Sequence, residues 1–259
     1  MDETTPESAT ESAPSIPGRP GFDPASIRVV ACDIFGTTVD WYTGVARQAS
    51  QIFAELGVDL DGGLFASEWR DRYIPSMNRV REHTRDWAYL DTLHRESLDD
   101  LLRQHGIAEA VDENARARLV RTWHRLPAWE DSVAGLVRLR SRYLVTTLSN
   151  GGFALLTTLV KAADLPFDCV LSAELARTYK PDARVYHTAA ELLDVEPHEI
   201  LMVAAHKWDL DGAAAAGLRT AFVERAREKG PDRTADRAAE VTSDLSVTGF
   251  PDLATALGV

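Results

Sequence analysis

The sequence contains little cysteine and no long hydrophobic run. Its 259 residues include two cysteines, Cys32 and Cys169, and each lies in its own short apolar segment. Two isolated thiols do not make a framework of disulfide bonds, which favours a protein of the reducing cytoplasm. No apolar stretch approaches the roughly 20 residues that cross a bilayer. We therefore expect a soluble chain.

Positive charge is also scarce. Lys and Arg number 28 against 40 Asp and Glu, which leaves a formal net charge of −12. Such a chain repels the phosphates of nucleic acids and of anionic membranes, so we expect neither as a partner. A small anionic substrate would need a local group of positive side chains.

Residues 1–26 are rich in Ser, Thr, Pro and Glu. They lack the basic and apolar regions of a secretory signal, and they also lack the apolar residues that a packed core requires. We predict a disordered N-terminal tail here.

What the sequence does contain is a series of short, unbroken apolar runs. Such runs are typical of parallel strands that are buried on both faces. They are Val29–Ile34, Leu144–Leu148, Cys169–Ser172, Ile200–Ala205 and Thr220–Val223. From about residue 143 the runs alternate with amphipathic stretches at Gly152–Ala162, Ala183–Leu193 and Asp209–Ala216. This alternation predicts an α/β fold with a doubly wound, mostly parallel sheet.

The long segment between the first two runs shows only helical periodicity. Its apolar residues recur at helical spacing, as in Val45, Ala49, Ile52 and Phe53. The segment is too long for a simple crossover, for which the single predicted helix Ser132–Arg140 suffices. We therefore predict a helical cap domain at 44–130, inserted into a core domain formed by 27–43 and 131–259.

Polar side chains gather where the predicted strands end. The first strand runs into Asp33 and Thr37, the second into Ser149-Asn150, and the fourth into His206-Lys207-Trp208-Asp209, while Lys180-Pro181 follows the third. Ligands of open α/β sheets bind outside the carboxyl ends of the strands. Each motif alone is ordinary loop or cap chemistry, but together they predict one site.

In this order the motifs resemble the signature of the haloacid dehalogenase superfamily over about residues 27–225. More narrowly, they look like the type II 2-haloacid dehalogenases. The matching stretches are Asp33 with Gly36-Thr37 and Asp40, Leu148–Gly151, Tyr179–Tyr186, Trp208-Asp209 and, in the helical insert, Trp69-Arg70. The resemblance implies a Rossmann-like core with a cap, hydrolytic removal of halide from a small 2-haloacid, and a homodimer formed through the insert.

Asp33 is the candidate nucleophile. A carboxylate at a strand tip, close to backbone N–H groups and to the cation of Lys180, can stay ionised and attack carbon or phosphorus to give an ester. The purely structural alternative is that the Asp33 carboxylate caps the following turn through Thr37. The other motifs of the site favour the role of Asp33 as a nucleophile.

Two departures from the superfamily's phosphatases narrow the reaction. Phe35 stands where those enzymes place an acidic residue that protonates the leaving group, and a halide needs no such acid. Ala205 stands where they carry a magnesium-binding Asp, which leaves Asp33 and Asp209 as the expected carboxylates of the site. We predict no metal and no other cofactor.

The resemblance supplies roles for the remaining residues. Ser149 and Asn150 would donate hydrogen bonds to the substrate, and Arg70 would bind its carboxylate or the departing halide. Asp209 would activate the water that hydrolyses the ester, with help from Thr37. The alternatives are an exposed helix arginine for Arg70 and an N-cap for Asp209.

The tip of the fourth strand differs from that of the best-known type II enzymes, which carry Ser and Asn where this chain has Ala204 and His206. His206 adds a larger group that can donate, accept or change charge. A donor-rich pocket would suit haloacetates, including fluoroacetate. Alternatively, His206 only packs beneath the insert. We expect Trp208 to form a pocket wall.

Two other functions stay open on the sequence alone. One is a superfamily phosphatase or phosphonatase, against which Phe35 and Ala205 count. The other is a domain that binds a small acid without turnover, against which the intact Asp33, Lys180 and Asp209 count. We expect His83, His94 and His105, which lie among polar stretches of the insert, to be surface or interface residues.

Overall fold

The computed structural model describes residues 22–259. Most of the tail predicted at 1–26 lies outside the described residues. At its end, Asp23 caps a single 3-10 turn, η1 (Pro24–Ser26), that leads into the first strand.

The core is a six-stranded parallel sheet with the order β3-β2-β1-β4-β5-β6. The strands are β1 (Val29–Cys32), β2 (Leu144–Ser149), β3 (Cys169–Ser172), β4 (Ile200–Ala204), β5 (Arg219–Val223) and β6 (Leu245–Val247). The chain winds outward from β1 through β2 to β3, and then returns to the other side of β1. The predicted doubly wound α/β fold is confirmed, and β1 lies at the point where the winding reverses.

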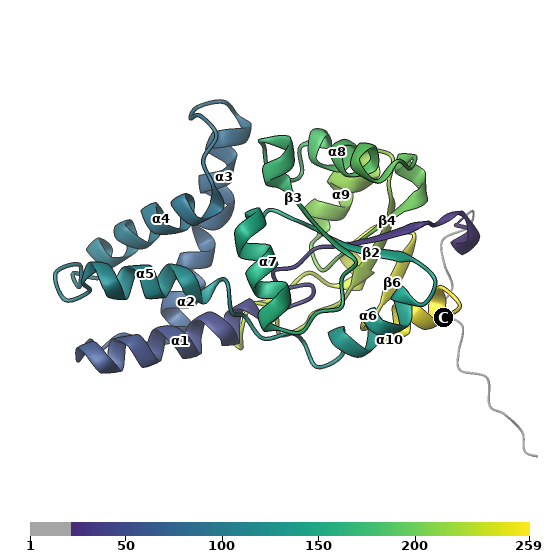
Figure 1. Cartoon of the computed structure of the whole chain (residues 1–259). Coiled ribbons are helices and arrows are strands. Elements are labelled where there is room, and N and C mark those ends of the chain that lie inside the picture. Colours follow the sequence, from purple (N-terminus) through teal and green to yellow (C-terminus); the bar gives the residue numbers. More distant parts are fainter. Residues whose placement is uncertain (1–21) are drawn as a thin grey trace, which may run out of the picture.

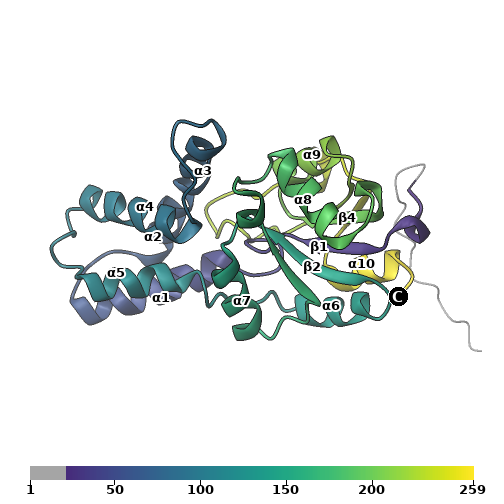
Figure 2. The same cartoon turned by 45° about the horizontal axis from the view of Figure 1, so that its top comes forward.

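Helices cover both faces of the sheet (Figures 1 and 2). One face carries α8 (Ala183–Leu193) and α9 (Lys207–Ala215), and the other carries α6 (Ser132–Arg140) and α10 (Phe250–Ala256), while α7 (Phe153–Ala162) packs at β3. All four residues of β1 and all five of β4 are buried. Burial on both faces explains why their sequences are unbroken apolar runs.

Five helices fill the long segment between β1 and β2. They are α1 (Trp41–Leu56), α2 (Gly62–Asp71), α3 (Tyr73–Arg81), α4 (Leu90–Gln104) and α5 (Glu113–Thr122). Figure 1 shows them gathered beside the carboxyl end of β1. Aromatic rings form much of their shared core: Phe65 meets Phe53 and Trp69, and Trp69 meets Trp123.

The chain passes between these helices and the sheet at two adjacent places. Val39 and Ala128 form an isolated antiparallel bridge. Beside it, the N–H of Asp40 donates to the carbonyl of Pro127 (2.9 Å). The outgoing and returning segments are therefore joined by hydrogen bonds.

Two sequence-based expectations need correction, and one strand was missed. Strand β6 was not predicted, because three residues are too few to show a pattern. Helix α9 begins at Lys207 with His206 as its N-cap, so Asp209 lies in the first helical turn and is not the cap. His94 is buried, 3% exposed, and not on the surface: its ring stacks on Trp123, and burial lowers its pKa to about 3.

Within residues 22–259, no helix combines the length and apolar character needed to span a bilayer.

Candidate active site

Asp33 follows β1 directly and is 5% exposed. Its backbone N–H donates to the carbonyl of Val203 (2.9 Å) and so continues the pairing with β4. The Thr37 hydroxyl donates to Asp33 Oδ2 (2.9 Å), while the Thr38 hydroxyl donates to the Asp33 carbonyl (2.7 Å). Gly36 has a φ of 88°, which lets the chain turn back tightly enough for these bonds. The carboxylate is therefore fixed at the tip of the strand.

Lys180 lies between two carboxylates. Its Nζ is 3.0 Å from Asp33 Oδ1 and 2.5 Å from Asp209 Oδ2, and it also donates to the carbonyl of Leu148 (2.8 Å). Burial disfavours the ammonium form, but the two carboxylates outweigh it and raise the Lys180 pKa. Lys180 is therefore a fixed cation that joins Asp33 to Asp209.

Asp209 has no exposed surface. It lies in the first turn of α9, and its Oδ1 accepts a hydrogen bond from the Tyr186 hydroxyl (2.8 Å). Burial raises the Asp209 pKa against the opposing influence of Lys180. A carboxylate with a raised pKa is a better proton acceptor than an ordinary one, as a water-activating base requires.

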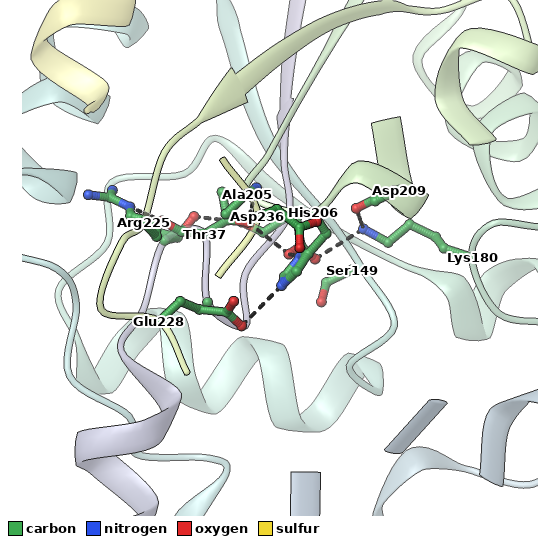
Figure 3. Close-up of polar contacts among 12 residues, drawn as sticks. Thr37, Ser149, Lys180, Ala205, His206, Asp209, Arg225, Glu228 and Asp236 are labelled. Atoms are coloured by element: carbon green, nitrogen blue, oxygen red, sulfur yellow. Dashed lines mark hydrogen bonds and ion pairs between the residues drawn. The ribbon is translucent and has the colours of Figure 1, made fainter. Parts of the chain in front are cut away.

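His206 lies on the other side of Asp33. Its Nδ1 is 3.3 Å from Asp33 Oδ2, and its Nε2 is 3.1 Å from Oε1 of Glu228 (Figure 3). Burial disfavours the imidazolium, but the two carboxylates outweigh it and raise the His206 pKa to about 10. His206 is therefore a second cation at the nucleophile.

The two cations determine the charge of Asp33. Burial alone would raise the pKa of this carboxyl, but Lys180 and His206 together hold it well below its usual range. Asp33 is consequently ionised at neutral pH, as a nucleophile must be.

Glu228 was not predicted from the sequence. It lies in the loop after β5, is 2% exposed, and accepts a hydrogen bond from the Trp41 indole (2.7 Å) as well as from His206. In the sequence it is one of several charged residues in a polar loop. Nothing in that pattern marks it as buried.

Arg70 reaches the site from α2. Its guanidinium carbon is 4.0 Å from the centre of the Tyr73 ring and 5.2 Å from that of Trp41. Its Nη1 is buried and has no hydrogen-bond partner among residues 22–259. The exposed-arginine alternative is therefore wrong, and Arg70 keeps a free donor for an anion.

A cavity of about 280 Å³ lies beside these residues and is lined in part by Trp41, Arg70, His206, Trp208 and Glu228. The Trp208 ring stacks on His206 with the ring centres 5.7 Å apart. Trp208 thus lies where a wall residue was expected.

Phe35 is buried and meets the edges of Trp123 and Tyr73. It adds an apolar, aromatic surface beside Asp33. No acid stands at this position.

Ser149 and Asn150 lie buried at the end of β2. The Asn150 side-chain oxygen accepts a hydrogen bond from the backbone N–H of Lys180 (2.7 Å), whereas its Nδ2 is buried without a partner in the described part of the chain. Ser149 Oγ accepts from the N–H of Gly151 (3.3 Å). Asn150 therefore offers a free donor, while Ser149 shapes the turn.

The carboxylates present suit a metal ion poorly. A divalent cation would need Asp33 and Asp209, and the Lys180 ammonium already bridges them. The backbone N–H of Ala205 donates to Thr37 Oγ1 (2.9 Å), so this position supports the nucleophile's loop. No group of three or more His, Cys, Asp or Glu residues in 22–259 could hold a metal.

Comparison with known proteins gives a consistent result. The family model described as haloacid dehalogenase-like hydrolase matches residues 27–217. The (S)-2-haloacid dehalogenase 1 of Pseudomonas sp. (strain CBS-3) is 33% identical over 205 residues, which cover 77% of this chain and 85% of that protein. The (S)-2-haloacid dehalogenase 4A of Burkholderia cepacia is 31% identical over 204 residues, which cover 77% of this chain and 84% of that protein.

The structure of the defluorinating L-2-haloacid dehalogenase Rha0230 superimposes with a TM-score of 0.87 at 40% identity, over 90% of this chain and 96% of that one. The family match covers most of the chain, and the similarity in sequence and in structure extends over 84% or more of each of these relatives. The chain therefore belongs to the haloacid dehalogenase-like hydrolases.

Proposed function

We propose that the chain hydrolyses small 2-haloacids to 2-hydroxyacids and halide. The observation that carries the proposal is Asp33, a buried carboxylate that Lys180 and His206 hold ionised, with Phe35 in place of a proton donor. The activities named for the similar dehalogenases support the same reaction.

In the first step, an Asp33 oxygen attacks C2 of the substrate. Among residues 22–259, Oδ1 accepts a hydrogen bond from Lys180 alone. Oδ2 accepts one from Thr37 and also lies 3.3 Å from His206 Nδ1, so Oδ1 is the freer nucleophile. A bond forms between Oδ1 and C2, and the carbon–halogen bond breaks with its electron pair leaving on the halide. Arg70 Nη1 and Asn150 Nδ2 are the free donors for the substrate carboxylate or the halide.

In the second step, water attacks Cγ of the Asp33 ester and gives its proton to Asp209. The electron pair of the carbonyl moves to Oδ2, and returns as the bond between Cγ and Oδ1 breaks. Oδ1 leaves with C2 as the alkoxide, and the oxygen of the water replaces it on Asp33. The released alkoxide takes the proton from Asp209, which completes the 2-hydroxyacid. The acid left at Asp33 loses its proton to solvent, and the nucleophile is restored.

Haloacetates and 2-halopropionates are the expected substrates. Fluoroacetate belongs with them because fluoride is a poor leaving group that needs hydrogen-bond donors. His206 adds a charged donor to the site, 3.3 Å from Asp33. The reaction uses no metal and no other cofactor, since Lys180 supplies the positive charge between the carboxylates. A cytoplasmic location and a homodimer formed through the insert complete the proposal, and size-exclusion chromatography with light scattering tests the dimer.

The test is halide release by the purified protein from chloroacetate, fluoroacetate and each enantiomer of 2-chloropropionate, in the presence of EDTA. We expect release from at least one of them, and none from Asp33→Asn. Asp164→Asn is a matched control, because Asp164 follows α7 and is not one of the residues of the site. Its backbone φ of 51° also suits Asn. Failure to release halide from any of these acids would refute the proposed reaction.

A further inference from the structure

Glu228, His206 and Asp33 form a continuous line of charged groups in the interior. Glu228 Oε1 is 3.1 Å from His206 Nε2, and His206 Nδ1 is 3.3 Å from Asp33 Oδ2. All three side chains are at least nine-tenths buried. Figure 3 shows Glu228 facing the imidazole from the side opposite Lys180 and Asp209.

The position of Glu228 is fixed by its neighbours. The Trp41 indole donates to the same Oε1 that faces His206 (2.7 Å). Gly36 lies so close that a Cβ there would stand 2.5 Å from this oxygen. The other oxygen, Oε2, is buried without a hydrogen-bond partner among residues 22–259. Burial disfavours the Glu228 anion, but His206 outweighs it and lowers the Glu228 pKa to about 2.

The charges that surround His206 come from several elements. Asp33, at the end of β1, and Glu228, in the loop after β5, face the imidazole directly. Lys180 and Asp209 lie beyond Asp33. The positive charge of Arg70, on α2, helps to lower the Glu228 pKa. Counted together with His206, three carboxylates face three cations. An imidazolium at position 206 makes this set neutral before substrate binds.

We propose that Glu228 is a positioning residue that keeps His206 protonated while Asp33 is an ester, so that His206 Nδ1–H stabilises the oxyanion of the second step. The inference rests on the proposed function. Alkylation removes the negative charge of Asp33, and Glu228 is then the carboxylate that still contacts the imidazolium.

The oxyanion forms on Oδ2, which accepts a hydrogen bond from Thr37 Oγ1 (2.9 Å). His206 Nδ1 lies 3.3 Å from the same oxygen and is buried without a hydrogen-bond partner among residues 22–259, so its N–H is available for the added negative charge. Preorganised donors of this kind stabilise developing negative charge without rearrangement. Glu228 therefore serves the hydrolysis of the ester more than its formation.

The test is a rapid-quench measurement of halide release and of the covalent adduct by mass spectrometry, with chloroacetate and Glu228→Gln. Glutamine keeps the size and a hydrogen bond but not the charge. We expect a burst of about one halide per site, an accumulated adduct on Asp33, and steady-state turnover lowered by roughly 10- to 100-fold. The loss should deepen above about pH 7, where an imidazole without carboxylate partners is neutral.

Two controls separate this role from simple damage. Glu224→Gln changes a partly exposed glutamate of the same loop, paired with Arg237, and should behave as wild type. On a His206→Asn background, Glu228→Gln should cause no further loss, since no charge remains to be held. A structural role alone would lower activity without a burst or a pH dependence.

Nitrogen-15 NMR of the imidazoles gives a readout without turnover. The His206 resonance, assigned by its absence in His206→Asn, should titrate at least about one pH unit lower in Glu228→Gln than in wild type. An unchanged titration, or turnover without adduct in Glu228→Gln, overturns the inference but leaves the proposed function intact. If the wild-type protein releases no halide, both fail.

Discussion

Lys180 Nζ lies 3.0 Å from Asp33 Oδ1 in a region that excludes solvent, although 147 positions separate the two residues. The parallel sheet makes this possible, because the ends of β1 and β3 reach the same edge. The pair gives the nucleophile its charge and also ties β1 to the loop before α8. Function and stability therefore depend on the same contact.

Replacement of Lys180 by Met should destabilise the fold. It leaves Asp33 and Asp209 buried without their shared cation, and breaking a buried ion pair in this way costs about 3–5 kcal/mol. Urea unfolding at pH 7 measures the loss. Lys161→Met, on the exposed side of α7, is the control and should change little. Equal stability of the two variants would mean that the buried carboxylates are protonated or hydrated.

Stability should fall as the pH rises from 7 to 9. The His206 pKa is raised by folding from 6.5 to about 10, so its contribution is complete below pH 6.5 and is lost as the pH rises through 10. Over this range the linkage amounts to roughly 2 kcal/mol.

The comparison variant for that measurement is His206→Asn with Glu228→Gln, which removes both charges. Its unfolding free energy should be flatter with pH than that of wild type. The range stops at pH 9, because burial raises the pKa of the Cys32 thiol from 9.0 and adds its own slope above that value. Parallel curves would show that His206 is neutral in the folded protein.

Arg70→Lys should weaken catalysis with little effect on stability. Lysine keeps the charge but loses the planar group that stacks on Tyr73 and the fixed direction of the free Nη1 donor. We expect kcat/KM for chloroacetate to fall about 10- to 100-fold. Arg47→Lys, exposed on α1, is the matched control. Unchanged kinetics would remove Arg70 from substrate binding.

Chelation should leave halide release unchanged, and added Mg²⁺ should not increase it. The physical reason is the Lys180 ammonium, which stands between the two carboxylates that a divalent ion would need. Steady-state rates after dialysis against EDTA, with and without Mg²⁺, measure this. A rate that collapses on dialysis and returns with the metal would contradict it.

The sequence predicts most of the sheet and the residues at its edge, because buried parallel strands are unbroken apolar runs and their carboxyl ends meet. Asp33, Lys180 and Asp209 follow from that rule together with the resemblance. The partner of His206 does not, because Glu228 lies in a loop without periodicity, and its contacts with Trp41, Gly36 and His206 come from distant parts of the chain. Tyr186 lies within the amphipathic stretch predicted at Ala183–Leu193, but its bond to Asp209 depends on how α8 and α9 pack.

The bridge between Val39 and Ala128 also affects how the helical insert is held relative to the sheet. Asp33 lies before this bridge in the chain and Arg70 lies beyond it, on α2. The Trp41 indole, which donates to Glu228, is a second tie between the helices and the sheet. A change in the angle between the two segments would therefore alter the distance between Arg70 and Asp33, so mutations at the bridge should change catalysis without replacing a residue of the site.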